Sequence, residues 1–158
     1  FKIDSGLIYF YADRSRILPI ADPDGRELII SCGAALFNLR IALHHFGYAG
    51  KIKTFPDSTD PDLLATIELG DPIQEATDEK LLFQAIQKRH TNRHDYQDWD
   101  VPETLLKSLQ KDAISEGAIL QVVKSDIARA NIAELVAQGD HLQMADANFR
   151  NELATWVR

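Results

Sequence analysis

Residues 27–46 read ELIISCGAALFNLRIALHHF and set the architecture of everything around them. Their apolar positions recur at three- and four-residue steps, which predicts an α-helix. The recurring residues are Leu28, Cys32, Ala35, Leu39, Ala42 and Leu43. The turn signal at residues 22–25 (DPDG) precedes this helix, and Gly47 follows as a natural C-terminal cap. Small side chains at residues 31–35 would let another helix approach closely, so we expect a buried central helix.

Shorter patterns flank this helix on both sides. Strands are expected at residues 7–11, 51–55, 63–69 and 118–123, because these runs are rich in β-favouring residues or alternate in polarity. Further helices are expected after Thr77, Val101-Pro102 and Ser125, with Thr77 and Ser125 as N-caps. The first of these helices carries Leu81, Leu82, Ala85 and Ile86. Gly117 should end the second, Gly139-Asp140 should break or bend the third, and a last helix should contain residues 142–156. Together these elements predict an α+β fold or a three-layer domain.

Composition narrows the class of protein. The 158 residues are 45% hydrophobic and carry a net charge of −7, as expected of a folded domain without a basic face. Acidity of this degree argues against general nucleic-acid binding. The uninterrupted apolar runs look too short to cross a bilayer, so we expect no membrane partner. Cys32 is the single cysteine, which excludes an internal disulfide and favours a reducing, cytoplasmic location.

An acidic stretch divides the chain. Residues 56–79 contain eight acidic side chains and no lysine or arginine, which is typical of a solvated loop or linker. The chain enters strand-like sequence at Phe1 and stops inside an apparent amphipathic helix. We therefore expect it to be an internal fragment of a longer protein.

Most residues with reactive side chains have an ordinary structural explanation. Cys32 lies in an apolar helix, where thiols are usually inert packing groups. His44 and His45 close that helix, where histidine suits the negative end of the helix dipole. His90 and His94 have an i,i+4 spacing, but a third metal ligand is missing from the pattern, so no metal is expected.

The most informative cluster is residues 88–93, KRHTNR, at the end of a predicted helix. Arginine forks match phosphate oxygens in a bidentate manner, and threonine or asparagine can bond hydroxyl groups. The cluster thus suits an anionic cofactor tail with a polyhydroxyl linker. The alternative, which spacing alone favours, is a basic helix end that answers the helix dipole.

The stretch 85–96 (AIQKRHTNRHDY), followed by Val101-Pro102 and a leucine-rich helix, resembles the start of an FMN-dependent nitroreductase module. Residues 31–39 and the strand at 63–70 resemble the later part of such a module. This order, with residues 12–16 and 151–156, is similar to the double-module, Acg-like branch of the family. The resemblance implies that residues 1–72 end a first module and residues 73–158 begin a second.

The resemblance implies a three-layer nitroreductase-like fold with a central antiparallel or mixed sheet and long central helices. It implies bound FMN, reduced transiently by NAD(P)H and reoxidised by a nitroaromatic or quinone-like acceptor. The implied cofactor-binding residues are Arg89, His90, Thr91, Asn92 and Arg93, with Arg89 and Arg93 on the phosphate and Thr91 on the ribityl chain. Catalytic residues stay unknown. Residues 51–56 (KIKTFP) lack the Glu-Gly pair that relatives place near the flavin ring, so the first module's own site is expected to be degenerate.

Three functional hypotheses follow from the sequence. The first is an FMN-dependent oxidoreductase, with its two modules paired within one polypeptide or as a homodimer. The second is a non-catalytic, FMN-sequestering or stress-related flavin-binding protein. The third is a helical interaction domain without a ligand, in which the small residues at 31–35 serve only packing.

Overall fold

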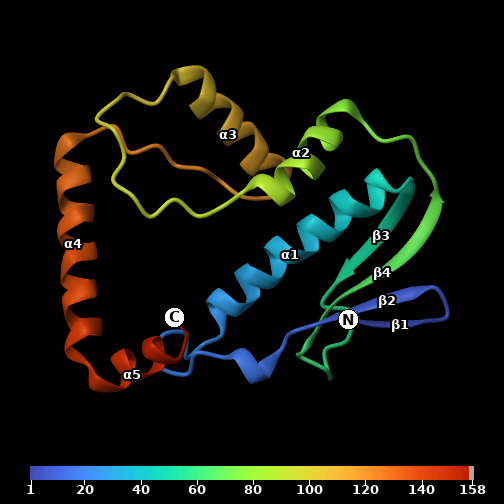
Figure 1. Cartoon of the computed structure of the whole chain (residues 1–158), viewed down its shortest axis with the longest axis horizontal. Helices are drawn as coiled ribbons and strands as arrows, with labels where there is room; N and C mark the ends of the chain where they lie inside the picture. The colour runs from blue at the N-terminus through green and yellow to red at the C-terminus, as the bar shows by residue number, and fades with distance from the viewer. Residues whose placement is uncertain (157–158) are drawn as a thin grey trace. The chain divides into compact units, whose positions relative to one another are not determined.

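The computed structural model describes residues 1–156 and divides the chain into two compact units, residues 1–91 and residues 92–158. The first unit contains an antiparallel sheet of four strands in the order β1-β2-β4-β3 (Figure 1). The strands are β1 (Lys2–Asp4), β2 (Leu7–Tyr11), β3 (Tyr48–Thr54) and β4 (Leu63–Pro72). A short 3-10 helix, η1 (Arg14–Arg16), and the helices α1 (Arg26–His45) and α2 (Thr77–Lys88) complete it. The predicted strands at 7–11, 51–55 and 63–69 are confirmed.

Strand register gives the sheet two different faces. One row of paired residues crosses all four strands and consists entirely of isoleucine: Ile3, Ile8, Ile67 and Ile52. The neighbouring row consists of Lys2, Tyr9, Thr66 and Lys53. Because successive side chains point to opposite faces of a strand, the first row faces α1 and the second faces away. The three-layer arrangement stays a prediction.

The core lies between the sheet and one face of α1. Phe10, Leu64, Ala65 and Ile67 are buried there, beneath half-buried side chains of α1. These α1 side chains are Leu28, Ile29, Cys32, Leu36, Leu39 and Leu43. Gly50 allows the close approach, because a Cβ at that position would lie 3.2 Å from Leu43 and 3.3 Å from Ile67.

The predicted limits of α1 are confirmed, but its predicted burial is not. Gly47 follows the helix with φ +81°, and its N–H donates to the His44 carbonyl. Asp22 accepts a hydrogen bond from the Leu28 N–H at the other end. The small residues Ser31, Gly33, Ala34 and Ala35 are exposed within the described chain, because the sheet covers only one face of the helix.

By length and composition alone α1 could cross a membrane, with a mean hydropathy of 1.3 over its 18-residue window, and it is the one such helix in residues 1–156. The expectation of no membrane partner, drawn from the shorter apolar runs, stays a prediction. Core helices pass the same test, and α1 lays one face on the sheet.

The second unit contains the helices α3 (Glu103–Ser115), α4 (Asp126–Ala145) and α5 (Ala147–Trp156). Gly117 ends α3 with φ +75°, and Ser125 caps α4 by accepting from the Ala128 N–H, both as predicted. Residues 118–123 were expected to form a strand, but they run alongside α3 as coil. A strand needs a partner for its backbone groups, and the described part of this unit offers none.

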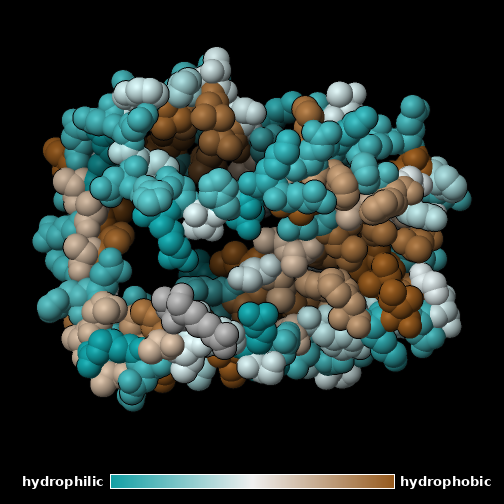
Figure 2. Space-filling model, viewed as in Figure 1, coloured by the Kyte–Doolittle hydropathy of each residue, from teal (hydrophilic) through white to brown (hydrophobic). Residues whose placement is uncertain are grey.

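Of the two outcomes predicted at Gly139-Asp140, a break or a bend, the break is wrong, because α4 continues to Ala145. Asp146 ends it instead and caps α5 by accepting from the Asn148 N–H at 2.8 Å. No described residue of this unit is buried. Figure 2 shows hydrophobic side chains open to the surface on α3, and α4 exposes Ile127, Leu135 and Leu142.

Candidate functional site

The predicted cofactor-binding residues follow directly from the end of α2. Arg89 is the C-cap of that helix, and its N–H donates to the Ala85 carbonyl at 2.8 Å. Residues 90–93 are coil, and all five side chains from Arg89 to Arg93 are exposed. Arg89, His90 and Thr91 belong to the first unit, whereas Asn92 and Arg93 belong to the second. The structure thus shows accessible groups on a continuous backbone, and their role in binding a cofactor stays a prediction.

Local hydrogen bonds shape this segment. The Asn92 Oδ1 accepts from the His94 N–H at 3.1 Å, while the Asn92 amide donates to the His94 carbonyl at 3.4 Å. The His90 Nδ1 lies 3.3 Å from the Lys88 carbonyl. Asn92 therefore uses its side chain to form a turn. Within residues 1–156, the side chains of Arg89, Thr91 and Arg93 remain available to bind a ligand.

The two arginines of the segment carry the strongest anion-binding potential. Within residues 1–156, no ion pair involves the guanidinium group of Arg89 or Arg93. An exposed guanidinium with five N–H donors can form paired hydrogen bonds to a phosphate. The donor chemistry of the segment therefore fits the terminal phosphate of a nucleotide cofactor such as FMN.

Cys32 lies in an apolar hollow of about 130 Å³ between α1 and the sheet. Phe10, Phe55 and Leu64 line it from the other side. Burial raises the pKa of the Cys32 thiol, while Arg14 weakly lowers it. A raised pKa means less thiolate at neutral pH, which agrees with the interpretation of Cys32 as a packing residue.

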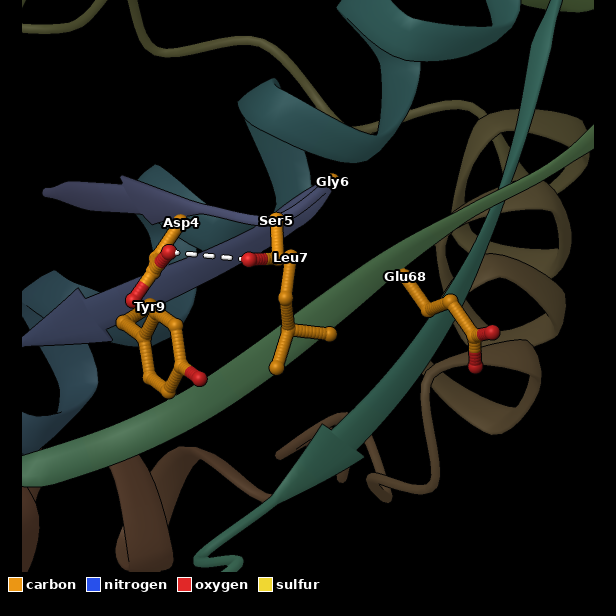
Figure 3. Close-up of a pocket in the computed structure, with 6 residues that line it drawn as sticks. All are labelled: Asp4, Ser5, Gly6, Leu7, Tyr9 and Glu68. Atoms are coloured by element: carbon orange, nitrogen blue, oxygen red, sulfur yellow. Dashed lines mark hydrogen bonds between the residues drawn. The ribbon is translucent and has the colours of Figure 1, made fainter.

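A second hollow, of about 300 Å³, lies at the β1–β2 hairpin (Figure 3). Its lining includes Asp4, Ser5 and Tyr9, and the Ser5 hydroxyl donates to the Asp4 carboxylate at 3.0 Å. Figure 3 shows Glu68 directed away from Asp4, so the two carboxylates do not converge. This hollow is a feature of the hairpin turn, where Ser5 and Gly6 both have positive φ.

The two histidines at the end of α1 do more than complement the helix dipole. The Nδ1 of His44 lies 2.6 Å from Glu79 Oε1, and the Nδ1 of His45 lies 2.9 Å from Glu75 Oε1. The interpretation of the whole acidic stretch as a solvated linker was therefore wrong for Glu75 and Glu79. Sequence reasoning missed these pairs because the partners lie 30 and 35 residues apart.

Asp62 is a further acidic residue of this stretch that makes a side-chain contact, because its carboxylate accepts from the Arg14 Nε at 2.6 Å. Two more elements of the predicted linker are also ordered. Residues 63–72 form the central strand β4, and Asp57 accepts from the Thr59 N–H and hydroxyl in a turn that lowers its pKa. Much of the acidic stretch is thus ordered structure that contacts the rest of the first unit.

Comparison with known proteins places the chain among named relatives. No protein-family profile matches it. A Mycobacterium tuberculosis protein with the provisional name NAD(P)H nitroreductase is 37% identical over 136 residues, which cover 85% of this chain and 38% of the relative. This chain is similar in sequence to proteins named as NAD(P)H nitroreductases. The resemblance predicted from the sequence is confirmed.

Two further relatives from the same organism support that relationship. One, without an assigned function, is 32% identical over 95% of this chain and 43% of its own length. The other, provisionally named NAD(P)H nitroreductase acg, is 27% identical over 95% of this chain and 45% of its own length. The chain thus spans less than half the length of these relatives.

Proposed function

We propose that this chain is part of an FMN-dependent NAD(P)H oxidoreductase of the nitroreductase type. The observation that carries the proposal is the exposed segment Arg89–Arg93 at the end of α2, in a chain related to proteins named as NAD(P)H nitroreductases. FMN would supply the redox chemistry by accepting hydride from NAD(P)H and passing electrons to a nitroaromatic or quinone-like acceptor.

The chain's own residues would bind and orient the cofactor. Arg89 and Arg93 would hold the phosphate through charged hydrogen bonds, and Thr91 would bond a ribityl hydroxyl. Asn92 would shape the turn between the two arginines through its bonds to His94. His90 has no specific task in this proposal beyond its place in the segment.

The proposal extends to the organisation of the whole protein. Residues 1–72 would close one nitroreductase-like module and residues 73–158 would open a second, within a three-layer fold. Pairing of two modules, in one polypeptide or in a homodimer, would cover the exposed apolar side chains of α3 and α4. Support comes from relatives more than twice as long as this chain. The single cysteine agrees with a cytoplasmic location.

The test is an FMN titration of the full-length protein and its Arg89→Ala variant. A charged hydrogen bond contributes about 1.5–3 kcal/mol, so the variant should bind FMN roughly tenfold to a hundredfold more weakly. Lys107→Ala removes one charge from an exposed position on α3 and serves as the matched control. Equal FMN affinity in Arg89→Ala and the parent protein would overturn the assignment.

A further inference from the structure

A narrow stripe of side chains holds α2 in place. Among the residues of this helix only Glu79, Phe83 and Ile86 are half-buried, and the rest are exposed. Their spacing of four and three residues puts them on one helix face. Leu81 and Leu82 lie on other faces, with exposed fractions of 62% and 42%. The orientation of α2 therefore depends on the contacts of this one face.

Two of those three residues contact the histidine pair at the end of α1. Glu79 accepts a hydrogen bond from the His44 Nδ1, because an ionised carboxylate can only accept. Phe83 stacks on the His45 ring, with ring centroids 3.7 Å apart and an interplanar angle of 9°. The same imidazole bonds Glu75, one residue before Ala76, which occupies the N-cap position of α2 that was predicted for Thr77. We name this arrangement of His44, His45, Glu75, Glu79 and Phe83 the histidine latch.

Glu79 joins the latch to the start of α2. Its Oε2 accepts from the Ala76 N–H at 3.4 Å, while its Oε1 bonds His44. The hydrogen bond from His44 lowers the pKa of Glu79, with smaller contributions from Ala76 and Arg40 in the same direction. A single carboxylate thus fixes both the first turn of α2 and its contact with α1.

The other end of α2 carries the candidate cofactor-binding segment. The helix runs without a break from Thr77 to Lys88, which is about 18 Å at 1.5 Å per residue. The Arg89 N–H closes its last turn on Ala85. A change of tilt at the latch would therefore move the backbone of Arg89, because the helix transmits it as a rigid rod.

We propose that His44 and His45 are positioning residues for the segment Arg89–Arg93, acting through α2. This inference rests on the proposed function, because the segment can be positioned for a cofactor only if FMN binds there. The latch itself is a claim about α1 and α2 alone.

The experiment compares three variants of the full-length protein with its parent. His44→Ala/His45→Ala removes the latch. His44→Asn keeps a donor close to the position of Nδ1, and so tests rescue. Asp62→Asn weakens the Arg14–Asp62 ion pair, which lies in the same unit but outside the latch and is more exposed, and serves as the control. All are measured well below the lowest melting temperature of the set.

The first readout is amide hydrogen exchange in the last turn of α2, at Arg89 above all, without flavin. Exchange should rise about tenfold or more in the double variant, a change of roughly 1.4 kcal/mol in opening free energy, and stay near the parent rate in His44→Asn and Asp62→Asn. Unchanged exchange in the double variant would overturn the latch. So would an equal rise in Asp62→Asn, because that would indicate general loosening.

The second readout is FMN affinity. The double variant should bind FMN about tenfold more weakly, and His44→Asn should recover most of the loss. Faster exchange with unchanged FMN affinity would overturn the positioning role while leaving the proposed function intact. If the parent protein itself fails to bind FMN, the proposed function fails and the positioning role fails with it, whereas hydrogen exchange still decides whether the latch exists.

Discussion

The two compact units differ in what covers their apolar side chains. In residues 1–91, Phe10, Leu64 and Ile67 are buried between the sheet and α1. In residues 92–156 no side chain is buried, although α4 is as long as α1. The apolar face of a helix is buried only where a second surface packs against it. The first unit has that surface within itself, and the described part of the second does not.

This difference bears on the candidate site, because the segment Arg89–Arg93 joins the two units. Its first three residues follow α2, a helix that packs on α1 of the first unit. Its last two residues begin a unit in which no residue up to 156 is buried. We therefore expect Arg89 to be the better ordered of the two arginines. This expectation rests on the difference in packing between the two units.

The largest expected effect is a difference in unfolding free energy between two isoleucine substitutions in the 158-residue chain. Ile67 is fully buried, whereas Ile127 is 75% exposed. Ile67→Ala should lower the free energy of unfolding of the first unit by about 2–5 kcal/mol, because it leaves a cavity in the core. Ile127→Ala should cost less than about 0.5 kcal/mol. Urea unfolding measures both, and similar losses in the two variants would break the comparison.

A smaller effect concerns acid stability of the first unit. The pKa of Glu79 lies below its ordinary value of 4.5, mainly through the hydrogen bond from His44. Its stabilisation is therefore complete above about pH 4.5 and is lost as the pH falls through the lower, folded-state pKa. The stability advantage of the parent over Glu79→Gln should shrink between pH 6 and pH 3.

Urea unfolding at pH 6, 5, 4 and 3 measures that advantage. Glu68→Gln provides the same loss of charge on the exposed face of the sheet, outside the latch. An advantage over Glu79→Gln that stays constant across the range would contradict the role given to His44 and Glu79.

The smallest expected effect lies in the second unit. Ser125 caps α4 by accepting from the Ala128 N–H at 3.3 Å. Ser125→Ala should destabilise α4 by about 0.5–1 kcal/mol, near the low end for cap removal, because no packed core restrains the helix. Hydrogen exchange in the first turn of α4 would show the loss as faster exchange. A loss above about 2 kcal/mol would mean that α4 is tied to a packed surface after all.

Local signals predicted much of the fold. The limits of α1 followed from its periodicity, the turn at 22–25 and Gly47, all of which act within a few residues. The strand at 63–69 was recognised despite its acidic surroundings, because alternation reports burial rather than net charge. The expected break at Gly139 failed for an equally local reason. An exposed glycine costs a helix only about 1 kcal/mol, which its neighbours offset until Asp146 offers a cap.

Contacts between distant residues were beyond sequence reasoning. The histidine latch joins residues 30 and 35 positions apart, and no periodicity encodes which carboxylates return to His44 and His45. Residues 118–123 had the composition of a strand, but pairing depends on a partner that composition does not reveal. For the candidate site, the position of residues 89–93 after a helix was predictable, whereas a cofactor's binding depends on surfaces contributed by other segments.

The proposed function requires that this protein carries FMN and passes electrons through it. The most direct measurement is the visible absorption spectrum of the purified full-length protein, followed by anaerobic addition of NADPH or NADH. We predict a flavin band that bleaches on addition of the reductant. A flavin band that persists with both reductants would favour a flavin-sequestering protein. The absence of a flavin band after incubation with FMN would contradict the account and leave residues 88–93 as a basic helix end.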